Sequence, residues 1–172
     1  MKRILAATVL SLALVNGVSA QGVRVKLPAW QEPVLLDTMR QEHALRGAPE
    51  KVYSAVLDAY RELEIPTGNT DGKVGIIGSE RFEKSRYLAG APMSMSFSCG
   101  ESATGPNADN HRLTIAIVTW VTAGANGGTT LAVAAAASAQ DPGGASRATR
   151  PCASTGRIEL KIKERVEKLV AR

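Results

Sequence analysis

Aromatic residues are scarce in this chain of 172 residues, and their scarcity argues against two kinds of ligand. The sequence contains only two Phe, two Trp and three Tyr. Binding of single-stranded nucleic acid and stacking on sugars both rely on aromatic faces. The net charge is +5, and it falls to +3 when Lys2 and Arg3 of the N-terminal segment are left out. That balance lacks the strong basic excess of a nucleic-acid binder. We expect no nucleic-acid partner.

Motifs for metal ions and cofactors are also lacking. The two histidines, His43 and His111, stand far apart in the sequence, and no C-x-x-C pair occurs. The polar run at residues 107–111, which contains Asp109, lacks the D-x-D-x-D-G spacing of a calcium loop. We therefore predict a turn at this run, and we expect neither a metal nor a cofactor.

Nucleophile motifs are incomplete. The stretch CGESATG at residues 99–105 resembles a nucleophile elbow, G-x-S-x-G, but its glycines enclose one residue too many around Ser102. Cys99 with His111 is the other combination, a thiol beside a base. Because a second cysteine is available to pair with Cys99, we predict no catalytic residue. A hydrolase that uses Cys99 or Ser102 stays open only as an alternative.

The first 20 residues are typical of a cleaved export signal. A positive dipeptide precedes a short apolar run at residues 4–15, and small residues lead to a cut predicted between Ala20 and Gln21. The apolar run is shorter than the ~20 residues that span a membrane. We predict a periplasmic or secreted protein with no transmembrane segment in the mature chain. The alternative is a buried N-terminal helix.

Cys99 and Cys152 are the only two cysteines. An even number of cysteines in an exported chain favours a disulfide. Closing a loop of about 54 residues contributes roughly 4 kcal/mol at most in the chain-entropy model. We predict that this bond joins the end of one strand to the segment just before the final helix.

The remaining length suits one domain, which we predict at residues 34–172. Residues 21–33 contain two prolines and a glycine, and we predict that they form a tether. One helix is predicted at residues 49–63, because Pro49 suits a first helical position and apolar residues follow at helical spacing. A second helix is predicted at residues 155–171.

The second helix carries two pairs of opposite charge four residues apart, which are Glu159 with Lys163 and Glu164 with Lys168. Both pairs have the polarity that favours an exposed ion pair on a helix. Each such pair contributes only a few tenths of a kcal/mol, roughly 0.2–0.5. Burial of the apolar stripe of the helix must therefore supply most of its stability.

Several segments have the composition and alternation of strands, and they are predicted at residues 34–46, 73–83, 93–99, 111–122 and 129–139. In residues 93–99 the alternation predicts a buried face and a wet face. The buried face would carry Met93, Met95, Phe97 and Cys99, and the wet face Ser94, Ser96 and Ser98. The order of elements predicts an α+β fold, with an antiparallel sheet of about four to five strands and both helices on one face.

Three segments, GAPEKVYSAVLDAYRELEIP, VGIIGSERF and CASTGRIELKIKERV, occur in this order. In this respect the chain resembles exported domains of unknown function from environmental bacteria and, more distantly, the helix-grip domains of BamC-like outer-membrane assembly lipoproteins. The resemblance covers residues 34–172 and includes no catalytic motif. The chain lacks the lipid-anchoring cysteine of the BamC-like proteins, so the resemblance does not extend to membrane attachment. It implies a binding or scaffolding module without enzymatic activity.

Two kinds of ligand site remain open. Basic residues surround Cys152 and the start of the final helix, where free N–H groups favour anions; they are Arg147, Arg150, Arg157 and Lys161. Ser154 or Thr155 could instead cap this helix and occupy those donors. An apolar cavity between helices and sheet would be lined by residues that otherwise form plain core, which are Tyr60, Met93, Met95 and Phe97.

The sequence as a whole predicts an exported, non-enzymatic envelope protein. It would bind an envelope protein through loops or through the wet face of its sheet, and neither the sequence nor the resemblance identifies that partner. The alternative is a soluble carrier of a small lipophilic or anionic ligand.

Overall fold

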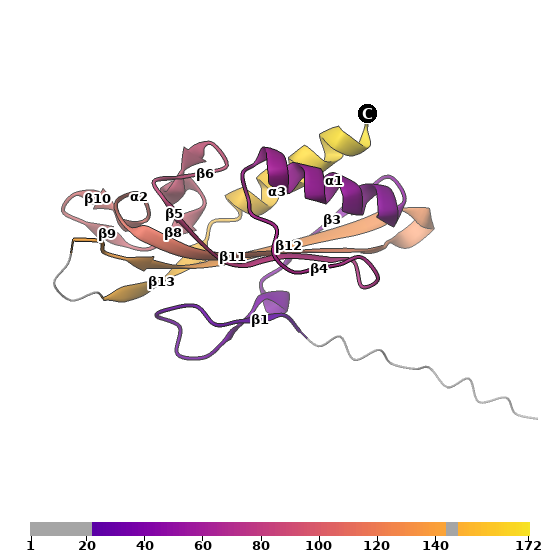
Figure 1. Cartoon of the computed structure of the whole chain (residues 1–172). Coiled ribbons are helices and arrows are strands. Elements are labelled where there is room, and N and C mark those ends of the chain that lie inside the picture. Colours follow the sequence, from indigo (N-terminus) through magenta and orange to yellow (C-terminus); the bar gives the residue numbers. More distant parts are fainter. Residues whose placement is uncertain (1–21, 144–147) are drawn as a thin grey trace, which may run out of the picture.

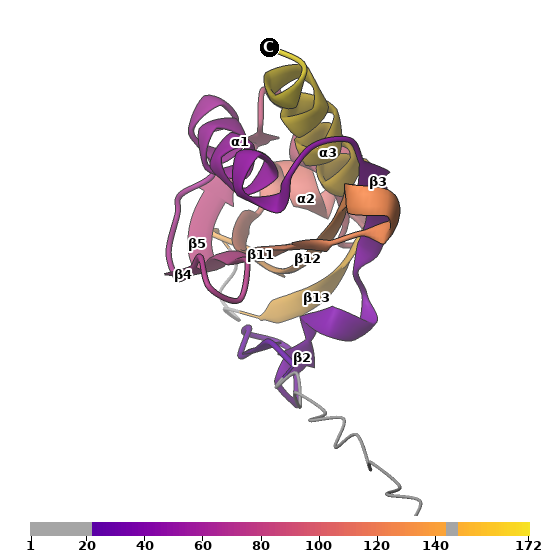
Figure 2. The same cartoon turned by 90° about the vertical axis from the view of Figure 1, so that its right-hand side faces the viewer.

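The computed structural model describes residues 22–143 and 148–172. The predicted export signal and its cut site lie outside the described residues, as does Arg147 of the predicted anion site. Three layers make up the described part of the chain: two helices, a sheet beneath them, and an N-terminal segment on the far side of the sheet (Figures 1 and 2).

The middle layer is an antiparallel sheet of seven strands. Along its path the strands are β4 (Thr70–Asp71), β5 (Ile76–Ser85), β11 (Arg112–Ala123), β12 (Thr129–Gln140), β13 (Thr149–Ser154) and β8 (Phe97–Ser98). The seventh strand, β3 (Gln41–Leu45), also pairs with β12. The α+β architecture with an antiparallel sheet is confirmed, and the sheet is larger than the four to five strands predicted.

A long hairpin, β11 and β12, forms the centre of the sheet. Its register runs without a break from Arg112 opposite Gln140 to Ala123 opposite Thr129. Nearly every residue of β12 is buried, because both faces of the strand are covered, and alanines lie on each face. Small side chains on both faces allow other layers to approach closely from above and below. The strands predicted at residues 111–122 and 129–139 are confirmed.

Helices α1 (Pro49–Glu62) and α3 (Arg157–Val170) lie side by side on one face of the sheet, as predicted (Figures 1 and 2). Pro49 occupies the first turn of α1, where its missing N–H costs nothing. The apolar stripes of the two helices close over the sheet. Their fully buried residues include Val52, Val56, Ala59, Tyr60, Ile158, Ile162 and Val166. This core holds most of the large buried side chains.

The opposite face of the sheet is covered by residues 22–38, which we call the strap (Figure 2). The strap contains a hairpin of β1 (Arg24–Val25) with β2 (Val34–Leu35), followed by a 3-10 turn, Leu36–Thr38. Its apolar side chains pack on Val118, Trp120 and the alanines of β12, and they are Val25, Leu27, Val34 and Leu36. Residues 22–33 are therefore part of the domain, and the tether predicted there is wrong. Both faces of β12 are apolar, so the second face also needs a cover.

Residues 93–99 do not form the predicted alternating strand. A 3-10 turn, Met93–Met95, replaces most of it, and only Phe97–Ser98 joins the sheet as β8. Asp109 accepts hydrogen bonds from both the amide and the hydroxyl of Ser94, at 2.8 and 2.7 Å, and these contacts bend the chain. As a result Ser96 is buried and Met95 is 43% exposed, the reverse of the prediction. The wet serine face on the sheet is therefore absent from the part of the chain described.

The other elements lie at the ends of the sheet. Two small hairpins occur there, β6 (Tyr87–Leu88) with β7 (Ala91–Pro92), and β9 (Glu101–Ser102) with β10 (Gly105–Pro106). The second leads into α2 (Asn107–Asn110), and a 3-10 turn, Ala125–Gly127, joins β11 to β12. In the described residues, no helix combines the length and apolar character needed to cross a membrane.

Candidate functional site

Cys99 and Cys152 are joined by a disulfide, with their Cα atoms 4.3 Å apart. Both residues are buried, and neither cysteine is free. The bond ties the chain just after β8 to the middle of β13, next to the pairing between those strands. A thiol nucleophile at Cys99 is therefore ruled out while this bond is intact.

Ser102 lies at the exposed tip of the β9–β10 hairpin. Its hydroxyl lies 3.1 Å from that of Thr104 and donates to the carbonyl of Gly105 at 3.2 Å. Within the described ranges no histidine or carboxylate contacts it. The arrangement is a polar turn, in which the serine has no base to activate it.

The two histidines lie toward opposite ends of β12. His43 on β3 stands opposite Leu131, whereas His111 comes just before Arg112, which stands opposite Gln140. Nine residues of strand correspond to about 30 Å. No group of three or more His, Cys, Asp or Glu residues with metal-site geometry occurs among residues 22–143 and 148–172.

The predicted anion site is altered by contacts within the chain. The Lys161 ammonium donates to the carbonyl of Ala89 at 2.6 Å. Thr155 accepts from the amide of Arg157, and Ser154 accepts from the amide of Gly156, at 3.3 and 3.1 Å. Side chains of the protein thus occupy the region where an anion was expected, and Arg150 and Arg157 are exposed beside it.

The predicted cavity lining divides into two parts. Tyr60, Met93 and Phe97 are fully buried members of the packed core, while Met95 is exposed. The Tyr60 hydroxyl lies 2.9 Å from that of Thr119. Burial raises the pKa of Tyr60, and the hydrogen bond with Thr119 opposes that shift only in part. These residues stabilise the interior of the domain.

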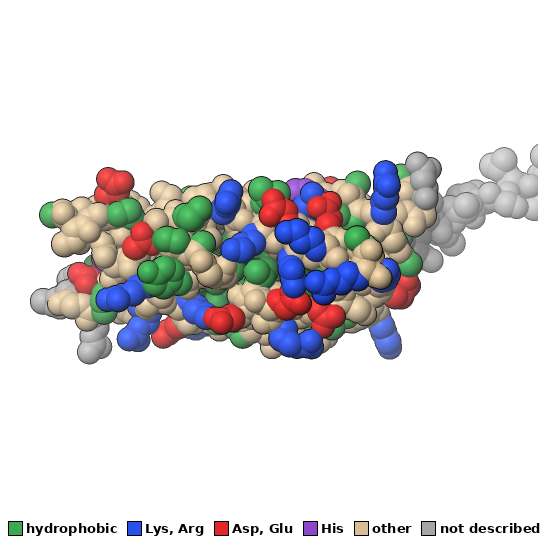
Figure 3. Space-filling model, turned by 90° about the horizontal axis from the view of Figure 1, so that it is seen from above, with side chains coloured by type: hydrophobic (Ala, Val, Ile, Leu, Met, Phe, Trp, Pro, Cys, Tyr) green, Lys and Arg blue, Asp and Glu red, His purple; other side chains and the backbone are tan. Residues whose placement is uncertain are grey.

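The structure brings together a surface that the sequence analysis missed. Its apolar part consists of Tyr87, Met95 and Leu160, which are 61%, 43% and 38% exposed. Its basic part consists of Arg86, Arg157 and Lys161, and we call the six residues the hairpin surface. Tyr87 is the one exposed residue among the seven aromatics, all of which are described. Figure 3 views the molecule from the side of the two helices and shows hydrophobic side chains gathered toward the end that carries β6.

Hydrogen bonds link the three segments that form the hairpin surface. Lys161 next to Leu160 bonds to Ala89 of the β6–β7 hairpin, and the Thr155 hydroxyl donates to the carbonyl of Met95 at 2.6 Å. The amide of Met93 donates to the carbonyl of Arg86 at 2.8 Å. These bonds hold the hairpin, the 3-10 turn and the start of α3 in one rigid arrangement.

The backbone of the β6–β7 hairpin carries unusual dihedral angles. Arg86 and Ala89 have φ of 66° and 51°, two of the four non-glycine residues in the left-handed region in the described chain. Such residues cost of order 1–3 kcal/mol each and cluster at functional sites. Strand propensity alone would predict an extended chain here. The sequence offers only two indications of the hairpin surface, the Ala-Gly turn and a tyrosine among polar residues.

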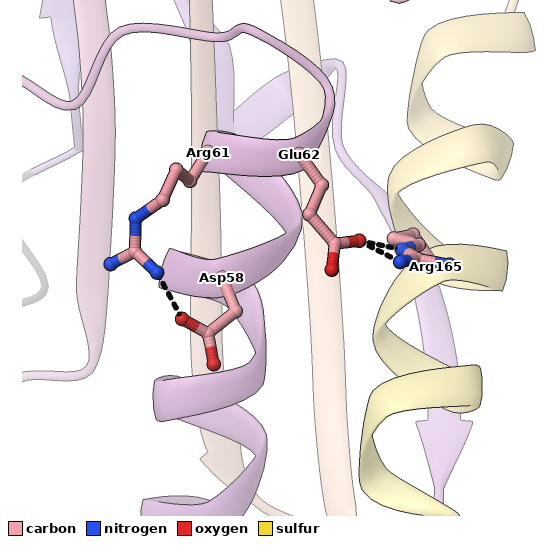
Figure 4. A network of polar contacts seen from close by, with 4 residues as sticks. All are labelled: Asp58, Arg61, Glu62 and Arg165. Atoms are coloured by element: carbon pink, nitrogen blue, oxygen red, sulfur yellow. Dashed lines mark hydrogen bonds and ion pairs between the residues drawn. The ribbon is translucent and has the colours of Figure 1, made fainter.

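Beside the hairpin surface, two clefts of about 430 and 400 Å³ meet at Glu62 and Leu63 near the end of α1. Here Arg165 of α3 forms an ion pair with Glu62 of α1, while Arg61 turns away to pair with Asp58 at 2.8 Å (Figure 4). Arg165 holds the pKa of Glu62 below its usual range. The pair joins the two helices next to the cleft.

No family model matches the chain, and no curated protein matches it either.

Proposed function

We propose that this protein is an exported, non-enzymatic binding module that recognises an envelope protein through the hairpin surface. The observation that supports this most is the exposed Tyr87 on a hairpin whose dihedral angles are costly. A large exposed aromatic is unfavourable in water, and apolar patches rimmed by charge are typical of interaction sites. The export signal predicted for residues 1–20 and the disulfide are compatible with a destination outside the cytoplasm.

The chemistry of the hairpin surface favours one kind of partner. Tyrosine and arginine are the residues that most often dominate binding energy at interfaces. Within the described residues, neither Arg86 nor Arg157 forms an ion pair, so both are available to a partner. The matching partner is a protein segment that carries both carboxylates and apolar side chains. Complementary charge would set its orientation and its rate of association.

A peptide experiment tests the proposal. Short labelled peptides that alternate leucine with aspartate, lysine or serine are titrated against the protein, with fluorescence anisotropy as the measurement. The aspartate peptide is expected to bind more tightly than the other two, and added salt is expected to weaken it. Tyr87→Ala should reduce its affinity by at least about tenfold, the behaviour of an interface anchor.

Charge reversal gives the matched control. Arg157→Glu should reduce binding of the aspartate peptide strongly, whereas Arg24→Glu, an equal change at an exposed position of the strap, should leave it unchanged. Equal binding of all three peptides would overturn the proposal. Binding to anionic lipid vesicles without binding to the peptide would overturn it in favour of a membrane surface.

A second candidate, a carrier of a small ligand, is favoured by a different observation. A hollow of about 550 Å³ lies between the end of β3, the start of α1 and the end of α3. Leu45 and Val170 line it together with Arg46, Lys51 and Glu167. Because Glu167 is paired with Lys163, the two basic residues suit a small carboxylate with an aliphatic chain. Native mass spectrometry of protein purified from its source would show the added mass of such a ligand, and a clean apo mass under gentle conditions would exclude it.

A further inference from the structure

The outer edge of β12 is shared by two strands that do not meet. β3 pairs with residues 129–133 of β12, and β13 pairs with residues 137–140. Within the described chain, no strand pairs with residues 134–136 on this edge. We call this interval the seam. Unpaired backbone groups in a buried interval need other partners, because leaving them unpaired is costly.

Two side chains from opposite layers reach this edge of β12, one within the seam and one at its border. Trp30 of the strap donates its indole N–H to the carbonyl of Ala137 at 3.1 Å. Glu159 in the first turn of α3 comes from the helix side, and the backbone amide of Ala135 lies close enough to its carboxyl to favour the charged form. Ala135 and Ala137 direct their backbone groups to the same edge, since alternate residues of a strand do so.

Glu159 is buried to an unusual degree for a carboxylic acid, with 1% of its surface exposed. The hydroxyl of Ser154 donates to Oε1 at 2.6 Å. Oε2 is buried and has no hydrogen-bond partner. The sequence had suggested an exposed ion pair between Glu159 and Lys163, but Lys163 pairs with Glu167 at 2.8 Å instead. A buried carboxylate oxygen without a partner is costly when charged and far less so when protonated.

The surroundings bring no compensating charge. On α3, Lys163 is engaged by Glu167. On β3, Glu42 stands opposite Ala132 and pairs with Arg40 at 2.8 Å, and His43 stands opposite Leu131. On β13 Arg150 is exposed, residues 134–136 of β12 are alanines, and no charged side chain is among the influences on the Glu159 carboxyl. Burial is the largest influence on the pKa of Glu159 and raises it; the Ser154 hydroxyl and the amides of Glu159 and Ala135 oppose the shift, without a normal hydrogen bond to Oε2.

We propose that Glu159 is a proton-binding site that controls how tightly α3 closes over the seam of the sheet. The neutral carboxyl lets α3 dock fully, while the buried carboxylate loosens the contact between the helix, β13 and residues 134–136. The direction follows from linkage. The folded protein holds this proton more tightly than the unfolded chain, in which a glutamate has a pKa of about 4.3. The stabilisation is complete below about pH 4.3 and is lost as the pH rises through the folded-state pKa.

Hydrogen exchange of the intact protein tests the inference. Amide protection at residues 134–136 and 149–156 is measured from pH 4 to 8, corrected for the intrinsic pH dependence of exchange. Protection is expected to fall with rising pH in the wild-type protein, by about tenfold for each unit by which the pKa is raised. Glu159→Gln should abolish this dependence, and Glu164→Gln, an exposed neutralisation on the same helix, should keep it.

A second measurement holds if the variant fails to fold. In the wild-type protein, carbon-13 NMR should show the Glu159 carboxyl titrating with a pKa above that of a free glutamate. Titration at or below that value would overturn the inference. The same pH dependence of exchange in the wild-type and Glu159→Gln proteins would also overturn it.

Discussion

Trp30 and Ala137 are joined by a hydrogen bond that spans 107 residues of sequence, from the indole N–H of the strap to a carbonyl on the edge of β12. The bond pins the strap next to the seam, at the residue of β12 where the pairing with β13 begins. It explains how a short segment with two prolines becomes a structural layer. The apolar side chains of the strap supply the burial, and Trp30 fixes its position.

The first prediction concerns this bond. Trp30→Phe keeps an aromatic ring but removes the donor to the carbonyl of Ala137, so it should cost about 1 kcal/mol. Limited proteolysis should then cut within residues 22–38 faster than in the wild-type protein, while the core stays intact. Trp120→Phe is the control, since it shrinks a ring under the strap without removing this bond. Equal cleavage of the two variants would contradict the role given to the bond.

Parts of the fold could be predicted because local pattern decides them. The apolar spacing of residues 49–63 and of the last helix, and the long runs of β11 and β12, are set by which residues face a core. These elements appear within a few residues of their predicted bounds. The pairing of Cys99 with Cys152 followed from the number of cysteines and from the export predicted from residues 1–20.

Other parts depend on contacts that no local pattern reveals. Residues 93–99 alternate as a strand does, yet Asp109 captures Ser94 and bends the chain. The strap has the composition of a linker, and only the second apolar face of β12 makes it structural. Glu159 has the spacing of an exposed ion pair, and its burial follows from the seam between two strands that lie far apart in the sequence. The hairpin surface likewise joins three separate segments.

The second prediction concerns the disulfide. Replacing both Cys99 and Cys152 with alanine should lower the free energy of unfolding by as much as about 4 kcal/mol, because the unfolded chain regains the freedom of a long loop. Chemical unfolding in urea measures the change. A reducing agent should lower the melting temperature of the wild-type protein toward that of the double variant, and should not affect the variant itself. A melting temperature of the wild-type protein that does not respond to reduction would contradict the prediction.

The third prediction concerns pH. Arg165 is the main reason that the pKa of Glu62 is lowered, and Arg61 contributes least (Figure 4). The stabilisation from this shift is present above about pH 4.3, the ordinary value, and is lost as the pH falls through the folded-state pKa. Arg165→Met should return the pKa of Glu62 toward its ordinary value, as NMR titration would show. Arg61→Met should change it little, and an equal shift in both variants would contradict the assignment.

The last prediction compares two glycines with nearly the same backbone angle and different surroundings. Gly75 and Gly90 have φ of 74° and 75°. A Cβ at Gly90 would meet no atom within 4 Å, whereas one at Gly75 would collide with the carbonyl of Val121. That carbonyl cannot move aside easily, because the Val121 amide donates to the carbonyl of Gly75 at 2.7 Å.

Gly90→Ala should therefore show only the conformational cost of a left-handed alanine, about 1–2 kcal/mol. Gly75→Ala should show that cost and the displacement of β11 as well, so it should be clearly less stable in urea unfolding. Because the substitution and the backbone angle are matched, the difference between the variants measures how closely the start of β5 approaches β11. Equal stabilities of the two variants would contradict the prediction, because they would show that β11 moves away from Gly75 without cost.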